Sequence, residues 1–428
     1  MWRVWLIVAL VTVVACRESA NQQIDARQDA RSCSPRPGYP ECGLDFSLTC
    51  GNGVVDNCIQ TVPSNDGAPM CPTYRPMTEE CDGSAGPSCS NIGYFGGAAA
   101  CTSHCHFDPR GCSACGVADC VTSQEAVQVG LATNSGHIAI AYEQAAEVTI
   151  FDDAAPGLEP LVTTMYADPI EAIVGVPNGW LVATSGSIDI HALANDGTHV
   201  GDSAAGLGEK PMMVYGPGGH AVLVGQEIVN SHPDLWAAVI DANANTIVAP
   251  FVLAPPSDDN LTPSLTTDGT SFFVGTRGQV TRLDANGAVV SMTTGFPTSQ
   301  SQVTALSISW SGTTGWYVLE DLNQGTTTAQ AFDATGAPLG LPISNLGSFM
   351  TVPVADGTGL LAITPTTLTP RLHLNLVSLD ATGAVVSTTE LGATDQDVDV
   401  RLGRFDATHV AITWQGAGKR ELALVSEP

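Results

Sequence analysis

Three aspartates near the C-terminal end of the chain could bind a cation or act in acid–base chemistry. Asp395, Asp397 and Asp399 alternate with other residues, so on a strand their carboxylates would share one face. A calcium loop would need a glycine at the next position, where Val400 stands instead. We therefore interpret the three carboxylates as a solvated face or rim, and we expect no metal site there.

Histidine and serine residues offer further candidates for catalysis. His137, His220 and His409 each follow a turn and begin an apolar run, so we interpret this shared position as structural. Ser203, in Gly201-Asp-Ser-Ala-Ala205, is one glycine short of a nucleophile elbow, and no strand–turn–helix pattern surrounds it. We expect Ser203 to be a non-catalytic residue of a loop between repeats. The sequence favours a protein without catalytic residues, cofactor or metal.

A cysteine near the N-terminus has the context of a lipidation site. After Met1-Trp-Arg3, residues 4–14 form an apolar run of eleven residues, typical of a secretory signal and too short to cross a bilayer as a helix. The run ends in Val13-Val-Ala-Cys16 and then turns polar, which resembles a bacterial lipobox. The resemblance implies cleavage before Cys16 and acylation of that cysteine. The alternative is an ordinary signal peptide with a chance cysteine.

The lipobox also predicts where the protein goes. Position 17 is an arginine and not the aspartate associated with retention in the inner membrane. We therefore expect an exported protein that its lipid anchors in the outer membrane, facing the periplasm or the cell surface.

Cysteine parity agrees with this prediction. The chain has 13 cysteines, and without Cys16 an even set of twelve remains. An even set crowded into one exported segment predicts a disulfide framework. Its members are Cys33, Cys42, Cys50, Cys58, Cys71, Cys81, Cys89, Cys101, Cys105, Cys112, Cys115 and Cys120.

Zinc is the competing interpretation of the same segment. Spacings that zinc sites use occur in Cys101-x₃-Cys105 and Cys112-x₂-Cys115, beside His104 and His106. Exported thiols oxidise, so we favour disulfides and expect the two histidines to lie on a surface loop.

Part of this segment resembles the Cys-rich repeats of myxobacterial secreted lipoproteins. The resemblance covers about 65 residues and rests on the motifs Cys50-Gly-Asn-Gly-Val-Val-Asp56, Glu80-Cys-Asp-Gly83, Gly93-Tyr-Phe-Gly-Gly97 and Cys101-Thr-Ser-His-Cys105. It departs from the family where about twenty residues separate the two opening motifs. This insertion carries Cys58 and Cys71, and an inserted pair most simply forms its own bridge. We therefore predict a Cys58–Cys71 disulfide and leave the other pairings open.

The chain beyond residue 125 has no cysteine and repeats itself. A turn followed by an apolar strand recurs seven times, at spacings of 40 to 51 residues, around positions 137, 180, 220, 271, 316, 360 and 409. A second element trails it by roughly twenty residues, as in Leu283-Asp-Ala-Asn-Gly287, where aspartate and glycine suit a hairpin turn. Four short strands every 40 to 50 residues predict the blade of a β-propeller.

The last repeat stops at its third strand, Glu421-Leu-Ala-Leu-Val-Ser426. Closure of the ring would then need a strand from residues 116–124, where Cys120 would link that strand to the Cys-rich segment. We predict an all-β chain: a seven-bladed propeller preceded by a small disulfide-rich module dominated by loops. If the count of repeats is wrong by one, the propeller has six or eight blades.

Tryptophans are the aromatic candidates for binding. Trp180, Trp316 and Trp414 share one type of strand position and are expected in the core between blades. Trp236 and Trp310 do not share it, so they are the better candidates for contacts with a ligand, although we favour core packing for both.

Composition limits the partners. The chain of 428 residues carries 43 Asp and Glu against 15 Lys and Arg, a formal charge of −28, which disfavours nucleic acid. We expect a lipoprotein signal peptide (1–15), a lipidated cysteine and flexible tether (16–32), a disulfide-rich module (33–120) and a propeller (121–428).

We predict that the propeller is a non-catalytic binding platform for an envelope protein or an extracellular polysaccharide, attached to the membrane by its lipid. The alternatives are a propeller enzyme, such as a lyase or glycoside hydrolase, and a passive structural surface protein. The sequence leaves the oligomeric state open.

Overall fold

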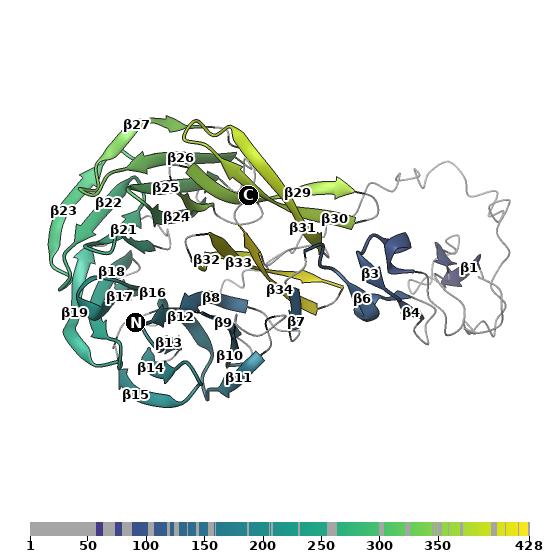
Figure 1. Cartoon of the computed structure of the whole chain (residues 1–428), viewed down its shortest axis with the longest axis horizontal. Helices are drawn as coiled ribbons and strands as arrows, with labels where there is room; N and C mark the ends of the chain where they lie inside the picture. The colour runs from purple at the N-terminus through teal and green to yellow at the C-terminus, as the bar shows by residue number, and fades with distance from the viewer. Residues whose placement is uncertain are drawn as a thin grey trace, which may run out of the picture. The chain divides into compact units, whose positions relative to one another are not determined.

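Seven four-stranded antiparallel sheets make up most of the structure, a computed structural model (Figure 1). It describes residues 57–62, 73–78 and 88–426, apart from short stretches, of which those of four or more residues are 102–106, 124–127, 153–157, 255–262, 299–303, 322–325 and 395–399. The predicted lipidation site Cys16 and the carboxylates of Asp395, Asp397 and Asp399 lie outside the described residues, as does Cys71, so the predicted Cys58–Cys71 bridge is not described.

The seven sheets confirm the predicted propeller and its blade count. Blade 1 comprises β8 (Gln128–Asn134), β9 (His137–Tyr142), β10 (Glu147–Asp152) and β11 (Pro160–Met165). Blade 2 comprises β12 (Ile170–Val176), β13 (Gly179–Thr184), β14 (Asp189–Ala194) and β15 (His199–Ala204). Blade 3 comprises β16 (Glu209–Tyr215), β17 (His220–Val229), β18 (His232–Asp241) and β19 (Thr246–Ala254).

The remaining blades follow the same order of strands. They comprise β20 (Ser264–Thr267), β21 (Phe272–Thr276), β22 (Gln279–Leu283) and β23 (Val289–Thr294); β24 (Thr304–Ser311), β25 (Thr314–Asp321), β26 (Thr326–Phe332) and β27 (Pro338–Ile343); β28 (Val354–Asp356), β29 (Gly359–Leu368), β30 (Arg371–Leu379) and β31 (Val385–Thr394); and β32 (Arg401–Arg404), β33 (His409–Gly416), β34 (Lys419–Ser426) and β7 (Cys120–Ser123).

The blades stand around a common axis. The first strands of consecutive blades contact one another, and β32 of blade 7 returns to contact β8 of blade 1. The fourth strands therefore form the outer edge (Figure 1). Blade 7 takes its fourth strand from the N-terminal side, because β7 pairs antiparallel with β34, with Leu422 opposite Val121. This confirms the predicted closure of the ring.

The recurring apolar run is the second strand of each blade. In β13 all six residues are buried, because each sheet packs against a neighbouring blade on both faces. Trp180 packs with residues of blade 1, Trp316 with blade 6 and Trp414 with blade 6. All three indoles are buried, as expected for the core between blades.

The recurring Asp–Gly element is the hairpin between the third and fourth strands. In blade 5, Asp333 Oδ1 accepts hydrogen bonds from the backbone N–H groups of Thr335 and Ala337 at 2.8 and 3.0 Å. Gly336 follows with φ +83°, a left-handed conformation that glycine adopts without a steric penalty. The predicted turn chemistry is confirmed.

Part of the Cys-rich segment belongs to the same compact unit as the blades, which comprises residues 84–102 and 107–428. A Cys89–Cys112 disulfide crosses it, and Ala114 packs in one cluster with Ala393 and Ala417 of the blades. Its short elements are η1 (Cys89–Ile92), β3 (Gly96–Gly97), β4 (Ala100–Cys101), β5 (Phe107–Asp108), η2 (Pro109–Gly111) and β6 (Cys112–Ser113).

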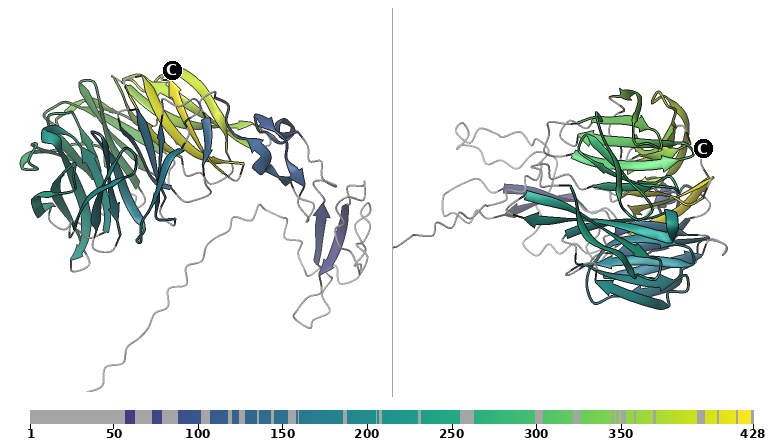
Figure 2. Two further views of the ribbon diagram at one scale, coloured as in Figure 1. Left: turned by 60° about the horizontal axis from the view of Figure 1, so that its bottom comes forward. Right: turned by 90° about the vertical axis from the view of Figure 1, so that its left-hand side faces the viewer.

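The unit of residues 1–83 and 103–106 contains one described hairpin, β1 (Asn57–Val62) with β2 (Thr73–Thr78). Among the described residues, no helix has the length and apolar character needed to span a membrane. Figure 2 shows the blades edge-on and the sheets stacked side by side.

Candidate functional site

Exposed apolar side chains gather on the outer strands of the blades. Of the thirteen large apolar residues that are exposed in the described part of the chain, all but Phe95 lie on fourth strands. They are Leu161, Met165, Val200, Ile247, Val252, Val289, Val290, Met292, Leu339, Leu341, Val385 and Val386. Exposed apolar side chains that gather on a surface mark a place where another molecule binds, whereas singly scattered ones are ordinary. The outer edge is therefore the first place to look for a site.

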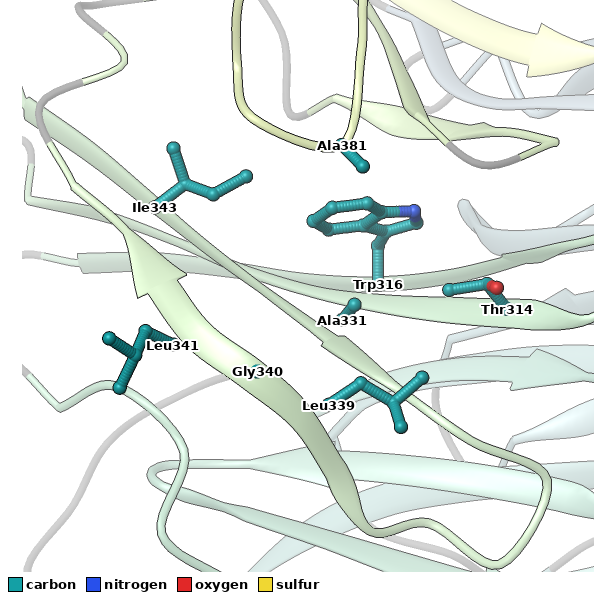
Figure 3. Close-up of a pocket in the computed structure, with 8 residues that line it drawn as sticks. All are labelled: Thr314, Trp316, Ala331, Leu339, Gly340, Leu341, Ile343 and Ala381. Carbon is teal, nitrogen blue, oxygen red and sulfur yellow. The ribbon is translucent and has the colours of Figure 1, made fainter.

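A groove of about 440 Å³ opens on this edge between blades 5 and 6 (Figure 3). Strand β27 forms one side, and Ala381, in the turn between β30 and β31, lies on the other. The Trp316 indole lies between them, near Ala381 in the close-up (Figure 3). The lining residues are Thr314, Trp316, Ala331, Leu339, Gly340, Leu341, Ile343 and Ala381.

A bulge in β27 shapes the groove. Ala331 pairs with Leu339, but Ala329 pairs with Ile343, so three residues of β27 stand opposite Gln330 alone. The buried Gln330 side chain satisfies the interrupted ladder, because its Nε2 donates to the carbonyl of Leu339 at 2.6 Å. Leu341, inside the bulge, is 88% exposed. A largely exposed leucine at the mouth of an apolar groove is positioned to contact a partner.

The groove offers few polar groups to a ligand, and the hydroxyl of Thr314 is one of them. The eight lining residues include no titratable side chain, so the groove suits apolar binding and not acid–base chemistry. Trp316 Nε1 is buried and has no hydrogen-bond partner in the described part of the chain. A buried donor without a partner is costly, and an acceptor would reach this atom only after the lining side chains moved.

The predicted contact tryptophans lie elsewhere. Trp310, on β24, stacks on Phe273 with ring centroids 5.4 Å apart, and its Nε1 donates to the carbonyl of Gly312. Trp236, on β18, packs against the core cluster between blades 2 and 3. Both are partly buried, and a binding role for either stays a prediction.

The other sequence candidates are not brought together. His137, His220 and His409 are each the first residue of a second strand, in blades 1, 3 and 7. The expectation that Ser203 lies in a loop is wrong, because Ser203 is part of β15. Strand β15 is an outer strand with few apolar residues, so a search for apolar runs in the sequence does not find it.

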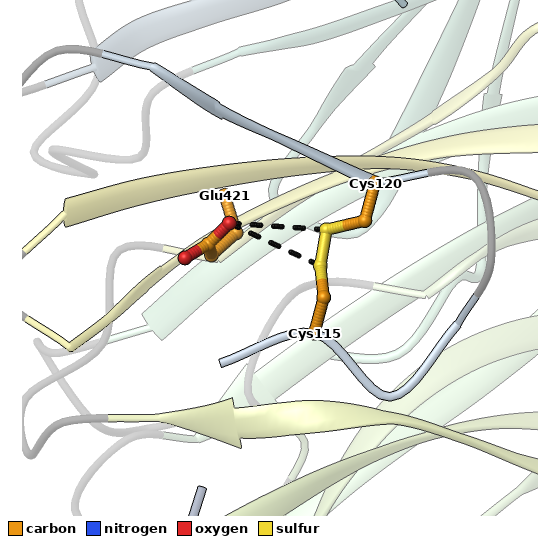
Figure 4. Close-up of side chains that lie close together, drawn as sticks. All are labelled: Cys115, Cys120 and Glu421. Carbon is orange, nitrogen blue, oxygen red and sulfur yellow. Dashed lines mark hydrogen bonds between the residues drawn. A yellow bond between two sulfur atoms is a disulfide. The ribbon is translucent and has the colours of Figure 1, made fainter. Parts of the chain in front are cut away.

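Three of the four cysteines of the zinc interpretation are in disulfides, and the fourth, Cys105, lies outside the described residues. Cys112 pairs with Cys89, Cys115 pairs with Cys120, and Cys101 is disulfide-bonded as well. The Cys115–Cys120 bridge fixes the start of the closing strand β7 (Figure 4). Oε2 of the buried Glu421, on the partner strand β34, lies 3.9 and 3.8 Å from the two sulfurs. The disulfide interpretation is confirmed for these cysteines.

Comparison with known proteins gives similarity of architecture alone. No protein-family model matches the chain, and no protein of curated function matches it. Among solved structures, the WD40 domain of Neurospora crassa Pan2 is 11% identical, with a TM-score of 0.49 over 72% of this chain and 94% of that one.

Two further structures are similar to the same extent. Saccharomyces cerevisiae Sqt1 is 10% identical, with a TM-score of 0.41 over 72% of this chain and 98% of that one. The β-propeller domain of Myceliophteria thermophila Cps50 (Swd1) is 13% identical, with a TM-score of 0.44 and the same coverage of both chains. We draw no conclusion about activity or ligands from these similarities.

The groove has one signal in the sequence that could have found it. Gly340 and Pro342 both stand inside the strand Pro338–Ile343. Either residue inside a strand indicates an edge or a bulge. The width of this bulge depends on which residues of β26 and β27 pair, and the residue types alone do not predict that pairing.

Proposed function

We propose that the protein is a lipid-anchored binding protein of the cell envelope, and that the groove between blades 5 and 6 binds an apolar segment of a protein partner. The single observation that carries the binding proposal is Leu341, exposed beside an apolar groove on an edge already rich in apolar side chains. A closed propeller is a rigid scaffold, and this fold is consistent with a binding platform.

The groove chemistry favours a protein partner over a polysaccharide. Sugar recognition needs several polar groups for the hydroxyls, whereas the groove offers apolar side chains, one threonine and the Nε1 donor of Trp316. An extended peptide supplies an apolar side chain and a backbone carbonyl together. The side chain would fill the groove, and the carbonyl would accept from Trp316 Nε1 once the lining side chains move to expose that atom.

Anchoring rests on the sequence. The lipobox-like Val13-Val-Ala-Cys16 supports attachment to the membrane through acylated Cys16. The disulfides Cys89–Cys112 and Cys115–Cys120 suit an oxidising compartment outside the cytoplasm. The formal charge of −28 favours cationic or neutral partners.

The experiment compares capture of envelope proteins by the full chain and by three variants. Leu341→Asp places a charge at the groove and should reduce capture of a near-stoichiometric partner at least about tenfold. Trp316→Phe keeps an aromatic side chain but removes the five-membered ring of the indole with its Nε1 donor, so it should weaken capture without unfolding the blade. Val386→Asp changes another exposed apolar residue, on β31 outside the groove, and should capture as the wild type does.

Equal capture by all four proteins would refute the groove as the binding site. No captured protein, together with binding to a polysaccharide panel, would move the proposal to a glycan ligand. Binding of neither would make the protein a passive surface component. In the same cells, Cys16→Ser should release the chain from the membrane fraction, and retention there would refute the lipid anchor.

A further inference from the structure

A second cluster, on the outer side of blade 2, carries chemistry that the groove does not use. His191 lies on β14, and His199 and Asp202 lie on the neighbouring outer strand β15. Asp202 Oδ1 is 2.6 Å from His191 Nδ1 and 2.7 Å from His199 Nε2. All three potential ligand atoms lie within 4.8 Å of one another. The cluster is far along the chain from the groove and belongs to a different blade.

A bulge assembles this cluster. His191 stands opposite Asp202 in the ladder, but residues 199 and 202 would point to opposite faces of a regular strand. The register shifts between Ala192 and Leu193, because Leu193 pairs with His199 and Val200 is left without a partner position. The extra residue turns His199 to the face of Asp202.

The same bulge occurs in other blades with different residues. The equivalent positions hold Thr281, Val289 and Met292 in blade 4, and Val377, Val385 and Thr388 in blade 6. Neither set contains a histidine or a carboxylate. The bulge is thus a feature of the repeat, and blade 2 places two imidazoles and a carboxylate on a framework that does not require them.

The hydrogen bonds around His191 orient it as a ligand. The hydroxyl of Thr184, 1% exposed, donates to the carbonyl of Asp189 at 3.4 Å, and its oxygen lies 3.3 Å from His191 Nε2. When Nδ1 binds a metal ion, that oxygen can accept from Nε2–H, so both ring nitrogens have a partner. In the metal-free protein Nδ1–H can donate to the carboxylate 2.6 Å away, and a metal ion would take the place of that proton. A fixed outer nitrogen is how proteins orient metal-binding histidines.

We propose that His191, His199 and Asp202 form a binding site for a divalent metal ion of the zinc class. Two imidazole nitrogens and one carboxylate oxygen, with a water in the fourth position, are a common zinc ligand set. Nitrogen ligands disfavour calcium and magnesium, which prefer oxygen.

The site needs small movements to close on the ion. Tetrahedral zinc with bonds of about 2.0–2.1 Å holds its ligand atoms about 3.3 Å apart, so the atoms that are now hydrogen-bonded must separate by about 0.6 Å. The side chains of His199 and Asp202 are 52% and 55% exposed and can move by this amount. Bound zinc would cross-link β14 to β15 at the outer edge.

Zinc binding to the full chain, treated first with a chelator, tests the proposal. Equilibrium dialysis against ZnCl₂ should give one ion per chain, and zinc should raise the thermal unfolding temperature. His199→Gln and Asp202→Asn should each weaken binding more than about tenfold. The matched control is His373→Gln, which removes a histidine paired with a single carboxylate, Glu390, at 2.6 Å and should bind as the wild type does.

The unfolding temperatures of the zinc-free proteins show whether a variant has lost the fold rather than the site. A variant that stays folded and still binds one zinc with wild-type affinity would overturn the proposal. So would a wild-type chain that binds no zinc, because the cluster would then be a set of hydrogen bonds alone. Each result is independent of whether Leu341 binds a partner.

Discussion

At the scale of single residues, hydrogen bonds within a turn lower the pKa of an aspartate, Asp406. Asp406 Oδ1 accepts hydrogen bonds from the backbone N–H groups of Thr408 and His409 at 2.6 and 2.7 Å. The hydrogen bond from the Thr408 N–H has the largest effect on the pKa of Asp406, and burial opposes it. The His409 ring and the Thr408 hydroxyl lower the pKa further, so that it falls from 3.8 to about 2. The ionised carboxylate is thus part of the turn that starts β33.

Stability should depend on pH through this carboxylate. Its pKa is lower in the folded protein than in the unfolded chain, so its contribution is present above about pH 4 and is lost as the pH falls toward 2. Asp406→Asn should therefore unfold at a lower temperature than wild type at pH 7, with a difference that shrinks between pH 4 and 2. Thermal unfolding across this range checks it, and a constant difference would contradict it.

Residue chemistry was predictable where the repeat gave several copies of a position. Trp180, Trp316 and Trp414 were assigned to the core because they share a strand position, and they are buried there. The His191, His199 and Asp202 cluster could not be predicted in this way. His199 joins His191 and Asp202 because the register shifts by one residue, and the side chains that meet depend on where in the ladder the shift falls.

At the scale of elements, the hairpin glycines differ in what surrounds them. Gly336 and Gly383 have φ of +83° and +82° in equivalent turns. A Cβ on Gly336 would lie 3.7 Å from its nearest neighbour, Val280 Cγ1, an ordinary contact. A Cβ on Gly383 would lie 2.5 Å from Leu346 Cδ2 and 2.9 Å from Ile343 Cγ2, so these side chains must move.

Replacing Gly336 and Gly383 by alanine, one at a time, should distinguish the cost of backbone strain from the cost of contacts with neighbouring side chains. Gly336→Ala should lower the free energy of unfolding by about 1–2 kcal/mol through the left-handed conformation alone. Gly383→Ala should lower it further, because Leu346 and Ile343 must also shift. Urea unfolding of both variants measures the difference. Equal losses would show that the neighbours of Gly383 adapt without cost.

Second strands and Asp–Gly turns were predictable, because each is a local pattern that recurs. The shape of β27 was not, since its bulge depends on which residues of β26 it pairs with. Gly340 and Pro342 indicate an irregular strand, but they do not reveal that Leu341 is exposed there.

At the scale of the whole molecule, two disulfides constrain chain segments of different length. Cys89–Cys112 spans 23 residues, and Cys115–Cys120 spans 5. A longer closed loop restricts the unfolded chain more. Replacing both cysteines by serine should lower the free energy of unfolding by about 3.4 kcal/mol for the first pair and about 2 kcal/mol for the second. Denaturant unfolding of the full chain tests the order, and the reverse order would contradict this account.

The closing strand has a consequence for how the chain is made. Strand β7 is synthesised before the blades, and its partner β34 is synthesised after them. Until residues 419–426 emerge, the backbone groups of β7 lack their native partner, and an unpaired strand edge is a template for other chains. When many copies fold close together, β7 of one chain can insert beside β34 of another, which is strand exchange. Folding at high protein concentration should therefore yield rings linked by exchanged β7 strands. Folding at low concentration should favour single rings, each closed by its own β7.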